Sequence, residues 1–192
     1  MQQQTLPRGR EDVRDALIQA ATQLFAQRGP MGVGVREIAQ LAQVNHGLVH
    51  RHFGSKDGLV KAVQNRLADT IAESVGTECD DEDLPKLMQA VRAATSQEGS
   101  WLRILAWSIL SGTEEDDQQD RFPLAKRMVK AAGRGPQDSL TPEARVTLVM
   151  SVGLGLMLFG PFLRRATGQS DSDWKRTGKQ IAAVLSRPHF LS

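Results

Sequence analysis

Four side chains that can donate hydrogen bonds or carry positive charge lie within seven residues: His46, His50, Arg51 and His52. His46 and His50 are four residues apart, so on a helix they share one face and can hold a metal ion or contact phosphate groups and base edges. No Asp, Glu or Cys stands beside them to complete a metal site. The pattern therefore favours contact with nucleic acid. A helical metal-binding protein or enzyme using His46, His50 and His52 is the alternative.

The histidines belong to a stretch, residues 35–53, in which two short helical patterns flank a turn. Ala39 lies where the two helices would approach most closely, and Asn45 is a favourable N-cap for the second one. In a helix-turn-helix the second helix enters the DNA major groove and the first braces it across the backbone. The apolar or small residues that allow the tight crossing are Ile38, Ala39, Ala42, Val44 and Val49.

The second helix of this motif predicts a DNA-reading surface. His46, Gly47 and Leu48 should face bases, and Lys56 should add a phosphate contact at the start of the next helix. Upstream, the first nine residues should form a flexible arm, and Arg8 and Arg10 could reach the DNA backbone. The full set of expected DNA-binding residues is Arg36, Asn45, His46, Gly47, Leu48, His50, Arg51, His52 and Lys56.

The flanking sequence supplies the helices that position this motif. Val13, Leu17, Ala21 and Phe25 recur at spacing four and form one buried helical face, which ends at Arg28-Gly29-Pro30. After Gly54-Ser55, a second stripe at spacing four runs from Leu59 to Val75. The sequence therefore predicts a three-helix DNA-binding unit, residues 10–66, followed by a long connecting helix over residues 55–75.

Taken together, AATQLFAQRG and VREIAQLAQVNHGLVHRHFGSKDGLV resemble the N-terminal domain of the tetracycline-repressor (TetR) family of bacterial transcriptional regulators. The resemblance covers about a third of the chain. It implies an all-helical homodimer whose C-terminal domain senses a small molecule. Three positions depart from the family pattern: Gln43 where Gly is usual, Gly34 where Ser or Thr would cap a helix, and His50 where Tyr is usual.

Charge is unevenly distributed along the 192 residues. Residues 1–66 carry a net charge of +4, residues 67–120 carry −10, and residues 121–192 carry +8. A basic N-terminal part suits a protein that meets phosphate there. The acidic runs 78–83 and 114–117 are expected to be solvated loops.

Cysteine usage and the N-terminus indicate the compartment and argue against catalysis. The single cysteine, Cys79, lies among acidic residues and fits a reducing cytoplasm better than a nucleophilic role. The first residues contain no apolar core of a signal peptide. No Gly-x-Ser-x-Gly or phosphate-binding loop is present, so we expect a cytoplasmic protein that is not an enzyme and needs no cofactor.

The C-terminal part, residues 67–192, reads as a helical ligand-binding and dimerisation domain. Helices are expected from Leu84, from Phe122, from Thr141 and from Ser170, and period-two alternation is absent, so almost no strand should form. The segment 101–110 is apolar nearly all round and predicts a central buried helix of this second domain.

Residues 146–163 contain no charge and are long enough for the membrane alternative to be weighed. Three glycines, Pro161 and two hydroxyl residues within a marginal length favour a helix buried against a partner subunit instead. In the TetR family the last two helices pair with their copies as a four-helix bundle. The candidates for that interface are Leu148, Val152, Gly155, Phe159, Ile181, Val184 and Leu185.

An effector pocket is expected among aromatic and methionine side chains, which suit an apolar, loosely specified ligand. The candidates are Trp101, Leu105, Phe122, Met128, Met150, Leu154 and Met157. The expected function is that of a DNA-binding transcriptional regulator, a repressor released from a palindromic operator by a small, largely apolar effector. Its expected partners are double-stranded DNA, a second copy of the chain and that effector, without a membrane.

Overall fold

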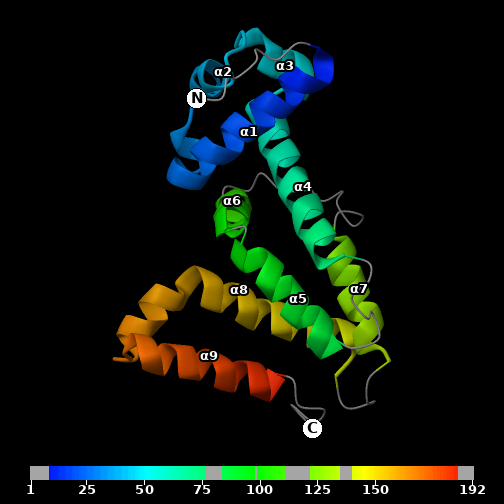
Figure 1. Cartoon of the computed structure of the whole chain (residues 1–192), viewed down its shortest axis with the longest axis vertical. Helices are drawn as coiled ribbons and strands as arrows, with labels where there is room; N and C mark the ends of the chain where they lie inside the picture. Colours follow the sequence, from blue (N-terminus) through cyan, green and yellow to red (C-terminus); the bar gives the residue numbers. More distant parts are fainter. Residues whose placement is uncertain (1–8, 77–83, 98, 111–121, 135–139, 186–192) are drawn as a thin grey trace, which may run out of the picture. The chain divides into compact units, whose positions relative to one another are not determined.

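The computed structural model describes residues 9–76, 84–97, 99–110, 122–134 and 140–185, and every regular element in them is helical (Figure 1). The all-α prediction is therefore confirmed for these residues. Cys79, the acidic runs 78–83 and 114–117, and Arg8 lie outside them. The elements are α1 (Arg10–Arg28), η1 (Pro30–Gly32), α2 (Val35–Leu41), α3 (Gly47–Phe53), α4 (Lys56–Val75), α5 (Leu84–Gln97), α6 (Gly99–Leu110), α7 (Pro123–Ala132), α8 (Pro142–Ala166) and α9 (Asp171–Leu185).

The chain forms two compact units. The N-terminal unit comprises residues 1–70 and 98–121, and the C-terminal unit comprises residues 71–97 and 122–192. The connecting helix α4 continues from one unit into the other without a break, as its apolar stripe predicts. The functional boundary between residues 66 and 67 stays a prediction.

The core of the N-terminal unit is built from one apolar face of each helix. Leu17 and Phe25 of α1, Ile38 of α2, and Val49 of α3 are at most 1% exposed. These residues share one cluster with Leu59, Val63 and Leu67 of α4 and with Ile104 of α6. Because α2 and α3 are only seven residues each, their stability comes from this packing rather than from helix propensity.

Helix α6 is placed differently from the sequence-based expectation. The segment 101–110 was expected in the core of the second domain, but α6 packs against α1 and η1 in the N-terminal unit. Its last turns are not enclosed: Trp107, Ile109 and Leu110 are 45%, 53% and 84% exposed. A helix that is apolar on all sides has no single preferred face, so its sequence does not identify the element against which it packs.

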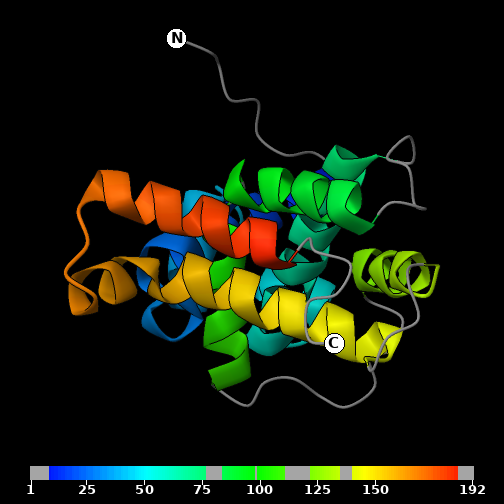
Figure 2. The same ribbon diagram turned by 90° about the horizontal axis from the view of Figure 1, so that it is seen from below.

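In the C-terminal unit, α7 packs against α5 and α8, and α8 and α9 run antiparallel beside one another (Figures 1 and 2). Two predicted helix starts are confirmed: Thr141 Oγ1 accepts from the Ala144 N–H at 3.2 Å, and Ser170 Oγ accepts from the Asp173 N–H at 3.2 Å. The hydrogen bond from Ser170 and the nearby Arg176 guanidinium lower the pKa of Asp173. Gly160 of α8 faces α9, since a Cβ there would lie 3.4 Å from the Trp174 ring, an ordinary van der Waals contact.

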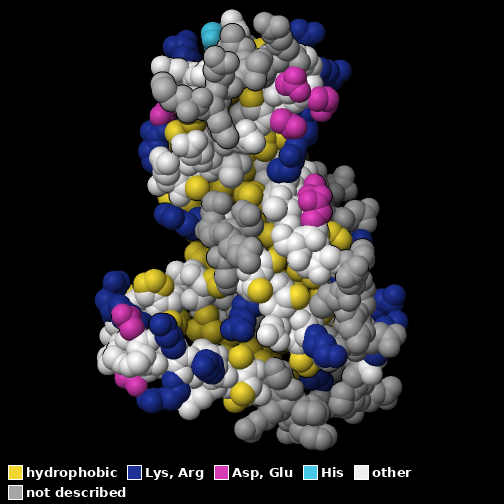
Figure 3. Space-filling view, in the orientation of Figure 1, with side chains coloured by type: hydrophobic (Ala, Val, Ile, Leu, Met, Phe, Trp, Pro, Cys, Tyr) yellow, Lys and Arg dark blue, Asp and Glu magenta, His cyan; other side chains and the backbone are white. Residues whose placement is uncertain are grey.

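Helix α8 carries an apolar surface that its own unit leaves uncovered. Its most apolar window has a mean hydropathy of 2.0 and is only 11% buried, so by length and composition alone it could span a membrane. A single such helix is weak evidence for a membrane span. Phe159 and Phe162 are 57% and 60% exposed, and a Cβ on Gly153 or Gly155 would meet nothing within 4 Å. Figure 3 shows hydrophobic side chains reaching the surface among lysines and arginines in this unit.

Candidate nucleic-acid interface

The turn between α2 and α3 is a Schellman motif. Val44 donates its N–H to the Ala39 carbonyl at 3.0 Å, and Gln43 donates to the Gln40 carbonyl at 3.1 Å. Gln43 lies at the left-handed position with φ +57°. Val44 then packs against the core, and Ala39, which is 1% exposed, lies on the inner face of α2. These backbone bonds fix the direction in which α3 leaves α2.

Helix α3 begins two residues after Asn45, at Gly47, and His46 occupies the cap position. The predicted N-cap is thus displaced by one residue. The Asn45 side chain still performs the expected task, because its Oδ1 accepts from the Gly47 N–H at 2.8 Å. One of the N–H groups at the start of α3 that lack an intrahelical partner is therefore satisfied.

One face of α3 is buried and the other faces solvent. Val49 is fully buried and Leu48 is half-buried against the core. On the outer side Gly47, His46, His50 and Arg51 are exposed, as are Arg36 on α2 and Asn45 in the turn, while His52 is half-buried. Figure 3 shows Lys and Arg side chains and a histidine at the end of this unit formed by α2 and α3, with acidic side chains on the adjacent flank. The assignment of these residues to DNA contacts stays a prediction.

His50 is oriented by the backbone that follows α3. Its Nδ1 lies 3.1 Å from the Gly54 carbonyl oxygen, and since a carbonyl oxygen only accepts, Nδ1 is the donor. In the neutral ring Nε2 then carries a lone pair. Nε2 can donate to a phosphate only when the ring is protonated.

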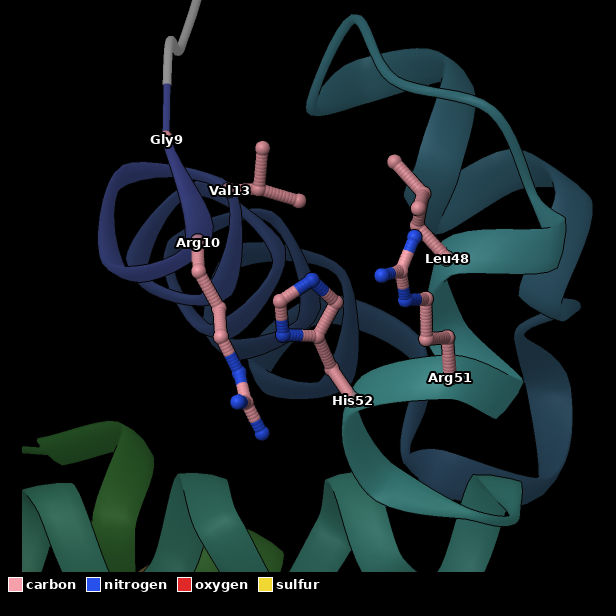
Figure 4. Close-up of a pocket in the computed structure, with 6 residues that line it drawn as sticks. All are labelled: Gly9, Arg10, Val13, Leu48, Arg51 and His52. Atoms are coloured by element: carbon pink, nitrogen blue, oxygen red, sulfur yellow. The ribbon is translucent and has the colours of Figure 1, made fainter.

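A hollow of about 450 Å³ separates the start of α1 from α3 (Figure 4). Arg10, Arg51 and His52 supply basic groups to it, and Val13 and Leu48 supply apolar walls. The His52 ring lies between the Arg10 and Arg51 side chains (Figure 4). Arg10 is the first residue of α1 and lies across the hollow from α3.

Lys56 is the first residue of α4, as predicted, and is half-buried. Ser55 caps this helix, with its Oγ accepting from the Gly58 N–H at 3.0 Å. The positive end of the helix dipole and the Lys56 ammonium favour an anion at this end of α4, where Asp57 is the acidic residue of the first turn.

The metal alternative draws no support from the described residues, which contain no group of three or more His, Cys, Asp and Glu side chains able to hold a metal ion. His46 and His50 therefore lack further ligands of these types within that part of the chain.

The predicted effector residues are divided between the two units. Trp101 and Leu105 lie on α6, and Trp101 packs against the core of the N-terminal unit. In the C-terminal unit Met128 is 4% exposed and Phe122 is 46% exposed. Thr95 of α5, a buried hydroxyl residue, approaches the Met157 sulfur at 3.9 Å. Met150 and Leu154 are half-buried on α8. Their role in effector binding stays a prediction.

The predicted dimer residues all lie on the two last helices, α8 and α9. Phe159 is exposed, and the other six are half-buried: Leu148, Val152, Gly155, Ile181, Val184 and Leu185. No residue of α9 is fully buried. The two helices thus leave partly exposed surface at the positions where the sequence predicts a dimer interface.

A short α2, a fixed turn and an α3 with an exposed polar face define the chain as a helix-turn-helix DNA-binding protein. The family described as "Bacterial regulatory proteins, tetR family" matches residues 17–63. The HTH-type transcriptional repressor Rv3405c of Mycobacterium tuberculosis is 36% identical over 187 residues, which cover 96% of this chain and 94% of that protein. The chain belongs to the TetR family and is a helix-turn-helix transcriptional regulator.

More distant relatives and solved structures agree with this assignment. The HTH-type transcriptional regulator BetI of Brucella canis is 27% identical over 165 residues, covering 83% of each chain. SCO4942 of Streptomyces coelicolor has a TM-score of 0.64 at 21% identity, covering 91% of this chain and 94% of that one. BioQ of Mycobacterium smegmatis has a TM-score of 0.60 at 19% identity, covering 90% and 94%. These two structures show the fold alone.

Proposed function

We propose that this regulator is a cytoplasmic homodimeric repressor, that it binds a palindromic operator, and that a small, largely apolar effector releases it. It acts by binding, and we assign it no catalytic step. The observation that carries the proposal is the exposed polar face of α3 on a short helix whose direction is fixed by the Gln43 turn.

In the docking that we propose, α3 enters the major groove with His46, Gly47 and Leu48 toward the bases. Lys56 and the hollow lined by Arg10, Arg51 and His52 receive backbone phosphates on either side of the groove. Val13 and Leu48 suit the apolar face of a deoxyribose. Cations without a base contact add affinity but no sequence preference.

Dimerisation is supported by the uncovered apolar surface of α8 and α9. The exposed Phe159 and the open space at Gly155 allow a second copy to approach closely. Two recognition helices in one dimer would read half-sites about 34–36 Å apart, one turn of DNA. The palindrome follows from the two-fold symmetry of such a dimer.

Release by an effector is supported by the continuity of α4. Its stripe runs from Leu59 to Val75 with no flexible linker to absorb a movement of the sensor. Arg127 of α7 donates to the carbonyl of Gly76 at 2.9 Å and so holds the end of α4 within the C-terminal unit. Effector and DNA should then be antagonistic, with a reciprocal coupling of about 1–3 kcal/mol.

The proposal is tested by selecting duplexes from a random-sequence library with the full-length protein. The expected result is a palindrome whose half-sites lie one helical turn apart. Lys56→Ala should weaken binding to all duplexes alike and lower the slope of log affinity against log salt by about one unit. Leu48→Ala on α3 should instead alter the selected sequence, and circular dichroism checks that it is folded because Leu48 also packs against the core. Failure to select any sequence would overturn the proposal.

A further inference from the structure

The junction between α1 and α2 lies against the indole of Trp107 on α6. Gly29 caps the end of α1, is buried, and donates its N–H to the Phe25 carbonyl at 2.8 Å. A Cβ built on Gly29 would lie 2.7 Å from Cε2 of Trp107 and 2.9 Å from its Nε1. The indole thus occupies the space that any side chain at this position would need.

Gly29 is constrained in two independent ways. Its φ is +71°, a conformation that residues with a Cβ rarely adopt, and the Trp107 ring closes the space beside it. The sequence explains the glycine as a helix end. The close approach of α6 is a second requirement that only the folded structure reveals.

Helix α6 is firmly seated on the N-terminal unit. Trp101, Ile104 and Trp107 recur at spacing three and turn one face toward α1 and η1. Ile104 is fully buried, and Ser108 is 2% exposed with its hydroxyl donating to the Ile104 carbonyl at 3.1 Å. The Ser108 hydroxyl is therefore satisfied. The Trp107 indole, which is 45% exposed, lies with one edge against Gly29.

After Gly29, the chain continues through η1 into α2 and α3, the helices of the DNA-binding motif. Gly32 donates its N–H to the Gly29 carbonyl at 3.2 Å, and Val33, one residue on, is 2% exposed. Arg28 at the end of α1 forms an ion pair with Glu37 in the first turn of α2. A displacement of Gly29 would therefore be passed to α2, which braces α3.

We infer that Trp107 is a positioning residue for DNA binding, because its indole on Gly29 sets the junction from which α2 and α3 extend. The inference rests on the proposed operator binding.

The test compares Trp107→Ala, Trp107→Phe and the matched control Ile109→Ala, which removes an exposed apolar side chain from the same helix. The probe is the duplex selected by the wild-type protein, with a scrambled duplex of equal length alongside. Trp107→Ala should lose about tenfold in affinity for the selected duplex, as when a base contact is lost, and bind the scrambled duplex as before. Trp107→Phe should restore most of the loss, and Ile109→Ala should stay within about twofold of wild type.

A double-mutant cycle with Gly29→Ala separates positioning from general destabilisation. The backbone strain that Gly29→Ala introduces at φ +71° is the same with or without the indole, so its effect on affinity cancels in the cycle. The collision of the new Cβ with the Trp107 ring occurs only when the indole is present, so its effect remains as the coupling. Gly29→Ala should therefore reduce affinity for the selected duplex more in the wild type than in Trp107→Ala. Circular dichroism confirms that each variant is folded at the temperature of the binding assay.

Two results would overturn the inference: a folded Trp107→Ala that binds the selected duplex like wild type, or a cycle with no coupling. These two results can be distinguished from failure of the proposed function. If that function is wrong, the wild-type protein itself selects no duplex, and the inference about Trp107 is then wrong as well. A lower melting temperature of Trp107→Ala with unchanged duplex affinity would assign the indole to stability alone and refute positioning.

Discussion

Gln43→Gly should stabilise the protein, although it removes a side chain. Within the described residues, Gln43 is the one residue other than glycine with a positive φ, +57°. The left-handed conformation destabilises a residue with a Cβ by about 1–2 kcal/mol, and glycine removes this strain. Glycine also has more conformational freedom in the unfolded chain, which offsets about 0.5–1 kcal/mol of the gain in stability. Gln43 is exposed, so few contacts are lost. The net gain should be about 0.5–1 kcal/mol, or about 1–4 °C in Tm.

The matched control is Gln40→Gly, the same change three residues earlier at an exposed position of α2. In the right-handed helix glycine is unfavourable, so this variant should lose about 0.5–1 kcal/mol. Thermal and urea unfolding followed by circular dichroism measures both variants, with the urea slope checked for constancy. The reasoning is refuted if Gln43→Gly melts below wild type or if the two variants shift in the same direction.

Two further predictions concern the N-cap of α2 and the dimer interface. Gly34→Ser should raise the free energy of unfolding by a few tenths of a kcal/mol, because the site is open and the new hydroxyl can accept from an N–H in the first turn of α2. Gly34→Ala, which adds no hydroxyl, should be less stable than Gly34→Ser, and urea unfolding measures both variants. Phe159→Glu should raise the dimer dissociation constant about 100-fold, because two copies each lose about 1.5 kcal/mol. Met31→Glu is the control, since Met31 is 69% exposed compared with 57% for Phe159 and lies outside α8, and it should leave the constant unchanged. Sedimentation equilibrium measures both variants, and an unchanged Phe159→Glu dimer excludes this interface.

The helix starts and the DNA-binding motif were predictable because their signals are local. Thr141, Ser170 and Ser55 each accept from an N–H three residues on, as their sequence contexts indicate. The crossing of α2 and α3 followed from small residues at fixed spacing, and Ala39 is buried as expected. The capping of α3 was predicted one residue away from its place.

The interactions that sequence reasoning missed are between segments far apart in the chain. Helix α6 is apolar on every side, so its pattern favoured a buried helix without indicating that Ile104 would join the core of α1. Arg10 and Arg51 line the same hollow because the start of α1 lies opposite α3, and no spacing along the chain indicates that. The same holds for Trp107 on Gly29.

If two copies of the chain dimerise through the apolar surface of α8, mutant and wild-type chains in one cell should form mixed dimers. A chain with a damaged α3 keeps Phe159, Phe162 and the open glycines of α8 unchanged, so it still associates with intact chains. Each mixed dimer presents one functional recognition helix to an operator that needs two. Alleles altered in α3 should therefore be dominant over the wild-type allele, and alleles altered at Phe159 should be recessive.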